Sequence, residues 1–183
     1  MDSNKIEEYK KRKSFALEYG TLLGASWVVV FVAYIIGIRT FNPLITMLCY
    51  GGLFAIALLP FILAYRYKKK HTLPEESITY GEGMHFCILM FSYAILLTGI
   101  AEYIYFAFID NGAIVSALSS YFTNPEMIQA LNDLNMNDMK DMMMENINAL
   151  SAISPFDITL SLAQINITIS IFMIFIVAAI MKK

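Results

Sequence analysis

The sequence predicts an all-α, polytopic membrane protein whose four transmembrane helices form two antiparallel hairpins. Of its 183 residues, 58% are hydrophobic and only 15% are charged, a balance that is too apolar for an ordinary soluble domain. The apolar residues also gather in four runs, each long enough for the roughly 20 helical residues that cross a bilayer. The expected spans of this single membrane domain, residues 1–183, are about 15–38, 44–65, 83–108 and 158–181.

The first two runs form the first expected hairpin, because only a short turn at residues 39–43 separates them. The first run follows a basic cluster, as in a signal peptide, but it exceeds the ~7–15 apolar residues of such a segment and is expected to be retained. Within it, Gly20 and Gly24 form a GxxxG pair, and Gly51 and Gly52 give the second run a small-residue face. Both patterns permit a neighbouring helix to approach closely.

The basic residues predict the orientation of the spans. Eleven of the thirteen lysines and arginines lie in residues 5–13, 66–70 and 182–183, next to the ends of spans. The positive-inside rule places such clusters in the cytoplasm, and all three agree with one alternation of four spans. Both termini are therefore expected inside, and the Arg39 turn and residues 112–155 outside. Topology and anionic lipid account for these clusters without a nucleic-acid partner.

Residues 112–155 form the only sizeable segment outside the expected spans, and they are acidic and rich in methionine. Asn124, Pro125 and Glu126 have the order of a cap, a first-turn proline and an acid at a helix start. A second amphipathic helix is expected from about residue 138 to 153. We expect these two helices to pack on each other as an extracytoplasmic cap. The alternatives are that their methionine face lies on the membrane or receives a protein partner.

The third run contains two costly intramembrane residues, His85 and Glu102. At helical spacing His85, Ser92 and Gly99 lie on one stripe, with Glu102 beside it. This side of the helix is expected to face protein, because a carboxylate in hydrocarbon costs at least a few kcal/mol unless it is paired or faces a cavity.

Glu102 has candidate partners on two other spans. Glu102 and Gln164 are expected at similar depths, about 10 Å below the outer surface, and Arg39 is long enough to reach down to them. We expect an ion pair between Glu102 and Arg39, with Gln164 as third partner, to lock helices one, three and four. The alternative is a proton or ion site. Asn166 lies on the other side of the fourth run and requires a further protein neighbour or a water-filled cavity.

At the predicted inner ends of the spans, Glu82 and His85 are three residues apart and can touch along one helix. We expect a hydrogen-bonded pair there; the alternatives are a proton relay or a metal site, for which the sequence offers no third ligand. Cys49 and Cys87 lie at opposite depths, which forbids a disulfide between them. The sequence contains no nucleophile triad, phosphate loop or nucleotide fingerprint, so it predicts no catalytic residues, no metal and no other cofactor.

Four short stretches resemble one family: Tyr19 with Gly20 in the first run, ITYGEG at residues 78–83, YIYFAFID at 103–110 and AAIMKK at 178–183. Their order is similar to that in the domain of unknown function 4199, a family of small membrane proteins from Bacteroidetes. The resemblance implies a four-helix integral protein of the bacterial inner membrane, and it implies no activity.

These features predict a non-enzymatic structural or interaction protein, or a subunit of a membrane assembly. It would act through the lipid bilayer, a membrane-protein partner or another copy of itself, and the sequence indicates no particular small-molecule ligand. The alternative is a small oligomeric transporter or channel that uses the polar residues around Glu102 and Gln164. That alternative requires several copies, because four helices are few for enclosing a hydrated path.

Overall fold

A computed structural model of the chain describes residues 3–71, 78–134 and 136–182. Every regular element in this part of the chain is helical, and four of its helices are long and apolar enough to cross a membrane. The predicted all-α class and the predicted number of candidate spans are therefore confirmed. The four long helices are α1 (Ser3–Thr40), α2 (Pro43–His71), α3 (Tyr80–Ile104) and α7 (Pro155–Met181).

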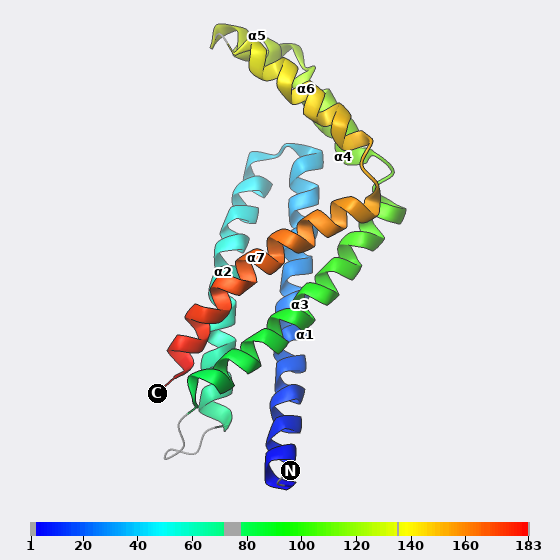
Figure 1. Ribbon diagram of the computed structural model, residues 1–183. Coiled ribbons are helices and arrows are strands. Elements are labelled where there is room, and N and C mark those ends of the chain that lie inside the picture. The colour runs from blue at the N-terminus through cyan, green and yellow to red at the C-terminus, as the bar shows by residue number, and fades with distance from the viewer. Residues whose placement is uncertain (1–2, 72–77, 135, 183) are drawn as a thin grey trace.

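Helix α3 connects the bundle, since it packs against both α1 and α7, while α2 packs along α1 (Figure 1). Contact between α2 and α7 is more limited. The start of α1 and the end of α7 lie at one end of the bundle, which we call the terminal end. The α1–α2 turn lies at the opposite, arm end, beyond which an arm projects (Figure 1). The arm consists of α4 (Ala113–Phe122), α5 (Pro125–Asp133) and α6 (Asn137–Ser151).

The two glycines of the GxxxG pair lie where α1 crosses α3. A Cβ atom added to Gly20 would lie 2.5 Å from the carbonyl oxygen of Met90. One added to Gly24 would lie 3.0 Å from the Cα atom of Ala94. The first distance is too short for a side chain and the second would force Ala94 to shift, so the absence of side chains lets the two backbones come together. The GxxxG pair thus serves a contact within the fold.

Helix α2 is attached to α1 by a short turn and a looser contact. The side chain of Asn42 accepts the backbone N–H of Leu44 at 2.9 Å and so caps the start of α2. Gly52 faces α1, where an added Cβ would lie 3.2 Å from Val30. Gly51 is exposed and has nothing within 4 Å of that position. Of the predicted small-residue face, only Gly52 is used in packing within the chain.

Aromatic packing closes the terminal end of the bundle. Tyr67 of α2 stacks on Phe86 of α3 with ring centroids 4.0 Å apart, and Tyr19 of α1 meets the same ring edge-on at 6.3 Å. On α3, Cys87 also contacts Met181 of α7, with their sulfur atoms 3.9 Å apart. All five side chains are buried. Three helices therefore converge on α3 at this end, which fixes their relative positions.

The buried face of α3 differs from the predicted stripe. Ser92 is exposed and donates a hydrogen bond to the carbonyl of Ile88 at 2.7 Å, while Met90, Ala94 and Glu102 are buried. A serine hydroxyl that is bonded to its own helix can face lipid at little cost, so Ser92 does not determine how the helix is turned. The close approach of α1 determines it instead. Glu102, in contrast, does face protein as expected.

The described residues between η1 and α7 form three α-helices, where two were expected. The additional helix, α4, begins directly after Gly112, whose φ of 77° reverses the chain at the end of α3. Helix α4 packs on α1 and on α6. The ring of Tyr121 in α4 stacks on Phe41, in the α1–α2 turn, with centroids 4.1 Å apart. Helix α4 therefore joins the arm to the bundle.

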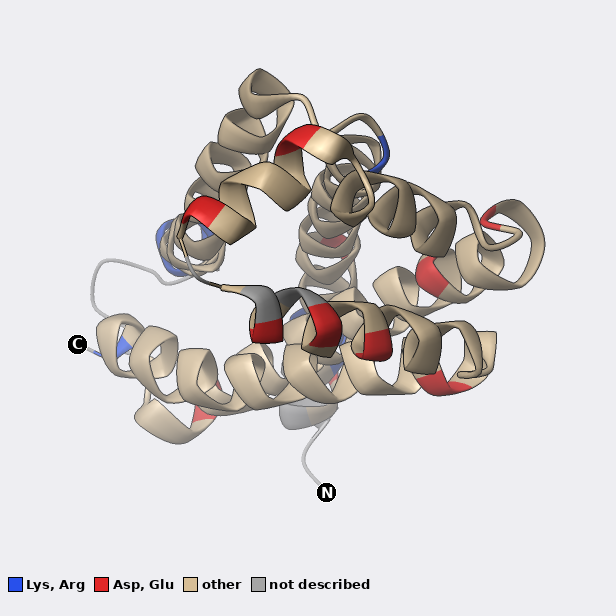
Figure 2. Ribbon diagram, turned by 90° about the horizontal axis from the view of Figure 1, so that it is seen from above, with Lys and Arg blue, Asp and Glu red and all other residues tan. Residues whose placement is uncertain are grey.

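Both helices that were predicted in this segment are present. The side chain of Asn124 accepts the N–H of Glu126 at 2.9 Å, which confirms the cap of α5, and α6 lies close to the expected residues 138–153. Helix α6 packs on α4 and α5 and buries Ile147, so this methionine-rich helix packs within the arm. Seen from the arm end, acidic positions are spread along the arm (Figure 2). By sequence, the acidic residues of α5 and α6 are Glu126, Asp133, Asp138, Asp141 and Glu145.

Candidate functional site

A cavity of about 300 Å³ lies between the four long helices. Its volume falls at the lower end of the range for small-molecule sites. Leu53 of α2 and Ile169 of α7 line it and are each about half exposed, so the cavity opens between these two helices, within their candidate spans. The lining residues are Trp27, Val30, Phe31 and Tyr34 of α1, Leu53, Ile56, Ala57 and Pro60 of α2, Phe91, Thr98 and Glu102 of α3, and Asn166, Ile169 and Met173 of α7.

Glu102 is the one acidic residue of this lining. It belongs to the last turn of α3 and is only 4% exposed. Its Oε2 atom has no hydrogen-bond partner among the described residues. A carboxylate that is buried without a partner destabilises a protein, in a membrane as in a soluble core. Glu102 is therefore the residue whose environment most requires explanation.

The backbone changes its geometry directly after Glu102. A π-helical turn, η1 (Tyr105–Ile109), follows α3, and in it the N–H of Asp110 donates to the carbonyl of Tyr105 at 2.9 Å. The buried Asp110 carboxylate accepts the Tyr105 hydroxyl at 2.9 Å and the N–H of Ile114 at 3.3 Å. Single π turns occur frequently at functional sites. The π turn η1 lies between Glu102, the acid that lines the cavity, and Asp110, the acid at the arm end.

The predicted ion pair between Glu102 and Arg39 is not formed. Arg39 is exposed at the end of α1, and its guanidinium interacts with the Tyr105 hydroxyl, one helical turn beyond Glu102. The acid nearest to this group of side chains is Asp110, which already bonds Tyr105. Arg39 therefore remains at the arm end, where its charge is solvated, and leaves Glu102 unpaired.

The predicted contact between Glu102 and Gln164 is not formed either. Gln164 is exposed on α7, whereas Asn166 lines the cavity together with Glu102. Successive residues of a helix are turned by about 100°, and α7 buries the side that carries Ser170, four residues after Asn166. The depth predicted for Gln164 agrees with that of the cavity, but the prediction that its side chain faces Glu102 is wrong.

Other polar side chains of the lining differ in how well they are satisfied. The Thr98 hydroxyl donates to the carbonyl of Ala94 at 2.9 Å. The indole Nε1 of Trp27 is buried and finds no partner in the described part of the chain. The cavity is thus bordered by one side chain with an unpaired donor, Trp27, and one with an unpaired acceptor, Glu102.

Four aromatic side chains contribute to the lining, three from α1 and one from α3. The ring of Trp27 lies 6.3 Å from that of Phe91, centroid to centroid. Phe31 is held edge-on against Tyr105 at 5.6 Å. Tyr34 is half-exposed and lies toward the arm end. Sequence reasoning missed this group, although Trp27, Phe31 and Tyr34 recur at the spacing of one helix face. That spacing alone does not tell an aromatic face in contact with lipid from one around a cavity.

A family model described as "Protein of unknown function (DUF4199)" matches residues 18–183, a range that includes every residue of the cavity lining. The chain belongs to this family. The resemblance that was based on the four short stretches is thereby confirmed. No curated protein and no solved structure matches the chain.

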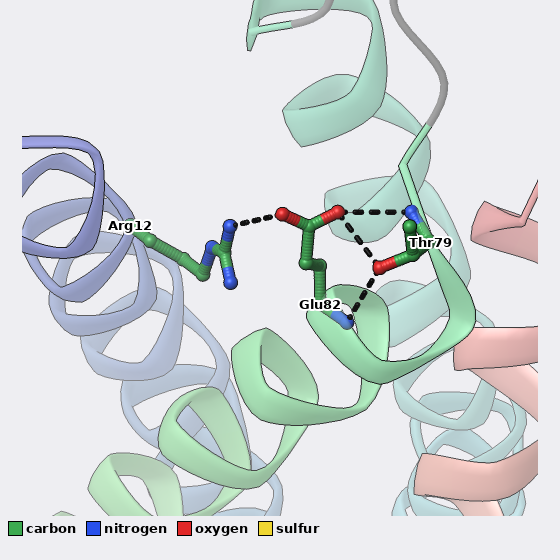
Figure 3. Close-up of polar contacts among 3 residues, drawn as sticks. All are labelled: Arg12, Thr79 and Glu82. Atoms are coloured by element: carbon green, nitrogen blue, oxygen red, sulfur yellow. Dashed lines mark hydrogen bonds and ion pairs between the residues drawn. The ribbon is translucent and has the colours of Figure 1, made fainter. Parts of the chain in front are cut away.

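A second polar cluster of this DUF4199 protein lies at the terminal end, and Figure 3 shows its three side chains. Glu82 accepts a hydrogen bond from Nη2 of Arg12 at 2.9 Å. Its other carboxylate oxygen accepts the N–H and the hydroxyl of Thr79 at 3.0 and 2.8 Å. The Thr79 hydroxyl oxygen in turn accepts the N–H of Glu82, which completes a capping box for α3. Glu82 therefore starts α3 and ties it to α1.

The expected pair of Glu82 and His85 is not formed, because the carboxylate of Glu82 is already engaged. His85 packs against the ring of Tyr9 at 5.6 Å, and its Nε2 atom has no partner within the described ranges. Across those ranges, no three side chains of His, Cys, Asp and Glu gather where they could hold a metal ion. Cys49 and Cys87 are free and buried.

Proposed function

We propose that this DUF4199 protein is a non-enzymatic integral membrane protein that binds a small lipophilic molecule in the cavity between α1, α2, α3 and α7. The observation that carries the proposal is the Glu102 carboxylate, which lines the cavity, is 4% exposed and has an oxygen without a partner in the described chain. A ligand that reaches this oxygen compensates for its lost hydration. Without such a ligand the residue only destabilises the fold.

The position of the opening supports a ligand that is dissolved in the bilayer. Leu53 and Ile169 flank the opening from two candidate spans, so it faces the hydrocarbon region if these helices cross the membrane. Most of the lining is aliphatic or aromatic, as expected of a small-molecule site. A few polar groups, Glu102 and Asn166 among them, then orient the ligand.

The composition of the lining favours binding over catalysis. Among the described residues it contains one carboxylate, Glu102, and no histidine, cysteine or lysine. Acid–base and nucleophilic mechanisms need a second group that is matched to the first and within hydrogen-bond reach. The hydroxyl of Thr98 is bonded to its own helix instead. We therefore assign Glu102 a role in recognition.

The proposal includes a topology of two hairpins in the bacterial inner membrane, with the arm outside the cytoplasm. The basic residues 10–13, 66–70 and Lys182 belong to the ends of α1, α2 and α7, which are the ends expected in the cytoplasm. The arm, at the opposite end, is acidic (Figure 2). This distribution of charge supports the orientation.

Fluorescence of Trp27 tests the proposal directly, because Trp27 is the only tryptophan of the chain and lines the cavity. The probes are two brominated compounds that quench tryptophan on contact, 4-bromobenzyltrimethylammonium and its neutral carbon isostere 4-bromoneopentylbenzene. In lipid nanodiscs at least one probe should quench Trp27 saturably. Ala57→Phe, which adds a phenyl ring to a residue of the cavity lining, should abolish this saturable quenching. Ala55→Phe, on an exposed residue of the same helix outside the lining, should leave it intact.

Linear quenching of equal slope in all three proteins would contradict the proposal, because it would show only collisions with probe dissolved in the lipid. Saturable quenching that survives Ala57→Phe would place the site elsewhere and would contradict the proposal as well. Circular dichroism of each variant shows that its helices are formed.

Carriage of the ligand across the membrane is a second candidate, favoured by one observation. Another cavity, of about 190 Å³, lies between α1 and α2 at the arm end and shares Tyr34 and Leu53 with the first. A ligand could thus reach Glu102 from two directions. Gln164 has no part in this candidate because it is exposed on α7. In proteoliposomes with a pH-sensitive dye inside, an imposed pH gradient tests for carriage that is coupled to protons. Proton flux that is lost in Glu102→Gln would favour such carriage. If neither protein gives proton flux, ligand binding remains the only proposed function.

A further inference from the structure

The cavity lining combines one carboxylate with four aromatic side chains, and no basic residue of the described chain belongs to it. We infer that the ligand is a lipophilic organic cation, such as a hydrophobic ammonium compound, whose positive group lies between Glu102 and the aromatic rings. This inference rests on the proposed function, because it specifies the class of molecule that the same cavity binds.

When it is ionised, Glu102 gives the site a negative charge that no basic residue of the described chain neutralises. Arg12 is paired with Glu82 at the terminal end, and Arg39 interacts with Tyr105 beyond the cavity. In an apolar surrounding the attraction between opposite charges is much stronger than in water. A neutral ligand without a hydrogen-bond donor would leave the carboxylate uncompensated and an anion would be repelled, whereas a cation meets it with both charge and, where it carries a donor, a hydrogen bond.

The aromatic rings favour the same class of ligand. Trp27, Phe31 and Tyr34 follow one face of α1, and Phe91 approaches from α3 with its centroid 6.3 Å from that of Trp27. The face of an aromatic ring attracts a cation within about 6 Å, most strongly for tryptophan and where water is excluded. Aromatic cages of this kind bind quaternary ammonium groups. The lining therefore brings four aromatic side chains and a carboxylate to the wall of one cavity.

Coordination chemistry argues for an organic cation over a metal ion. A hard cation such as Ca²⁺ takes about six to eight oxygen ligands. The lining supplies the carboxylate of Glu102, the amide of Asn166 and the hydroxyls of Thr98 and Tyr34, and Thr98 is bonded to its own helix. A space of about 300 Å³ with mostly apolar walls is much larger than a bare ion and suits hydrocarbon substituents.

The experiment compares the two brominated probes, which have the same shape and differ in one positive charge. Quenching of Trp27 is titrated in nanodiscs of neutral lipid, with each probe concentration expressed per volume of lipid phase. We expect the ammonium probe to bind roughly tenfold or more tightly than its neutral isostere. Glu102→Gln should weaken binding of the ammonium probe by about the same factor and leave the neutral probe unchanged.

Two variants control for indirect effects. Glu82→Gln makes the same chemical change at the terminal end, away from the cavity, and should alter the binding of neither probe. Unchanged binding of the neutral probe to Glu102→Gln shows that the cavity of this variant is intact. If Glu102→Gln fails to fold, Phe91→Leu provides the alternative: it removes one ring and should weaken the ammonium probe more than the neutral one.

The outcomes separate this inference from the proposed function. Equal, saturable binding of the two probes, or equal losses of both in Glu102→Gln, would overturn recognition of a cation and leave the binding cavity standing. Saturable binding of neither probe to the wild-type protein would overturn both.

Discussion

Arg12 and Glu82 form an ion pair across the contact of α1 and α3, with Nη2 and Oε1 2.9 Å apart, whereas Glu102 on the same α3 has no such partner among the described residues. The side chain of Glu82 is 40% exposed, and both of its oxygens accept hydrogen bonds. Glu102 is 4% exposed. Because burial increases the cost of an unpaired charge, stability alone would select the opposite arrangement. The proposed ligand at Glu102 would account for this distribution of partners on α3.

The first prediction concerns the double role of Glu82. Glu82→Gln should lower the free energy of unfolding by at most about 1 kcal/mol, because the ion pair with Arg12 is partly exposed. Glu82→Ala also removes the two hydrogen bonds that the carboxylate accepts from Thr79, one half of the capping box, and should cost about 1 kcal/mol more. Unfolding in mixed micelles with increasing dodecyl sulfate measures both. Equal losses in the two variants would show that the carboxylate half of the capping box contributes nothing.

The second prediction concerns the contact between α1 and α3. Gly20→Ala should destabilise the protein by about 1–3 kcal/mol, because its new methyl group would lie 2.5 Å from the carbonyl oxygen of Met90 and force the helices apart. Gly51→Ala, where the same position is open, should be neutral or slightly stabilising, since alanine favours the helix. Thermal unfolding in detergent, compared between these two matched variants, measures the difference. Similar melting temperatures would contradict the close crossing.

Much of this fold could be predicted from the sequence, because span length and capping depend on local composition. The four apolar helices and the Asn124 cap needed no knowledge of neighbouring segments. The extra helix α4 was missed because its residues, AIVSALSSYF, are apolar and follow Gly112 without a capping side chain. A helix that begins in this way lacks the usual start signal.

The candidate site was harder to predict, because it depends on how each helix is turned about its axis. The distances of Glu102 and Gln164 from the ends of their spans predicted similar depths in the membrane. In the structure, however, Asn166 lines the cavity, because its side of α7 is the one that packs. Likewise Ser92 was expected to face protein and is exposed. The rotation of a helix about its own axis depends on where its small residues pack closely against a neighbour, as Gly20 packs against Met90. This packing depends on both helices and cannot be read from one of them.

The third prediction concerns the missing partner of Glu102. Glu102→Leu should raise the free energy of unfolding in the absence of ligand by about 1–3 kcal/mol, because it removes an unsatisfied buried carboxylate and keeps a similar volume. Arg39→Ala should have a small effect, and the effects of the two changes should add within about 0.5 kcal/mol. If Glu102→Leu instead lowers the free energy of unfolding, and lowers it less in a protein that already carries Arg39→Ala, the two residues form the ion pair after all.

The fourth prediction concerns orientation. In a variant whose two buried cysteines are replaced by alanine (Cys49→Ala, Cys87→Ala), a single cysteine is introduced at exposed Asp133 in the arm or at exposed Lys182 at the end of α7. With four spans and basic clusters in the cytoplasm, a membrane-impermeant maleimide applied to intact spheroplasts should label Asp133→Cys and spare Lys182→Cys. Both should react after lysis, which shows that each site is accessible. Labelling of Lys182→Cys alone before lysis would invert the topology, and labelling of both would require an even number of crossings between them.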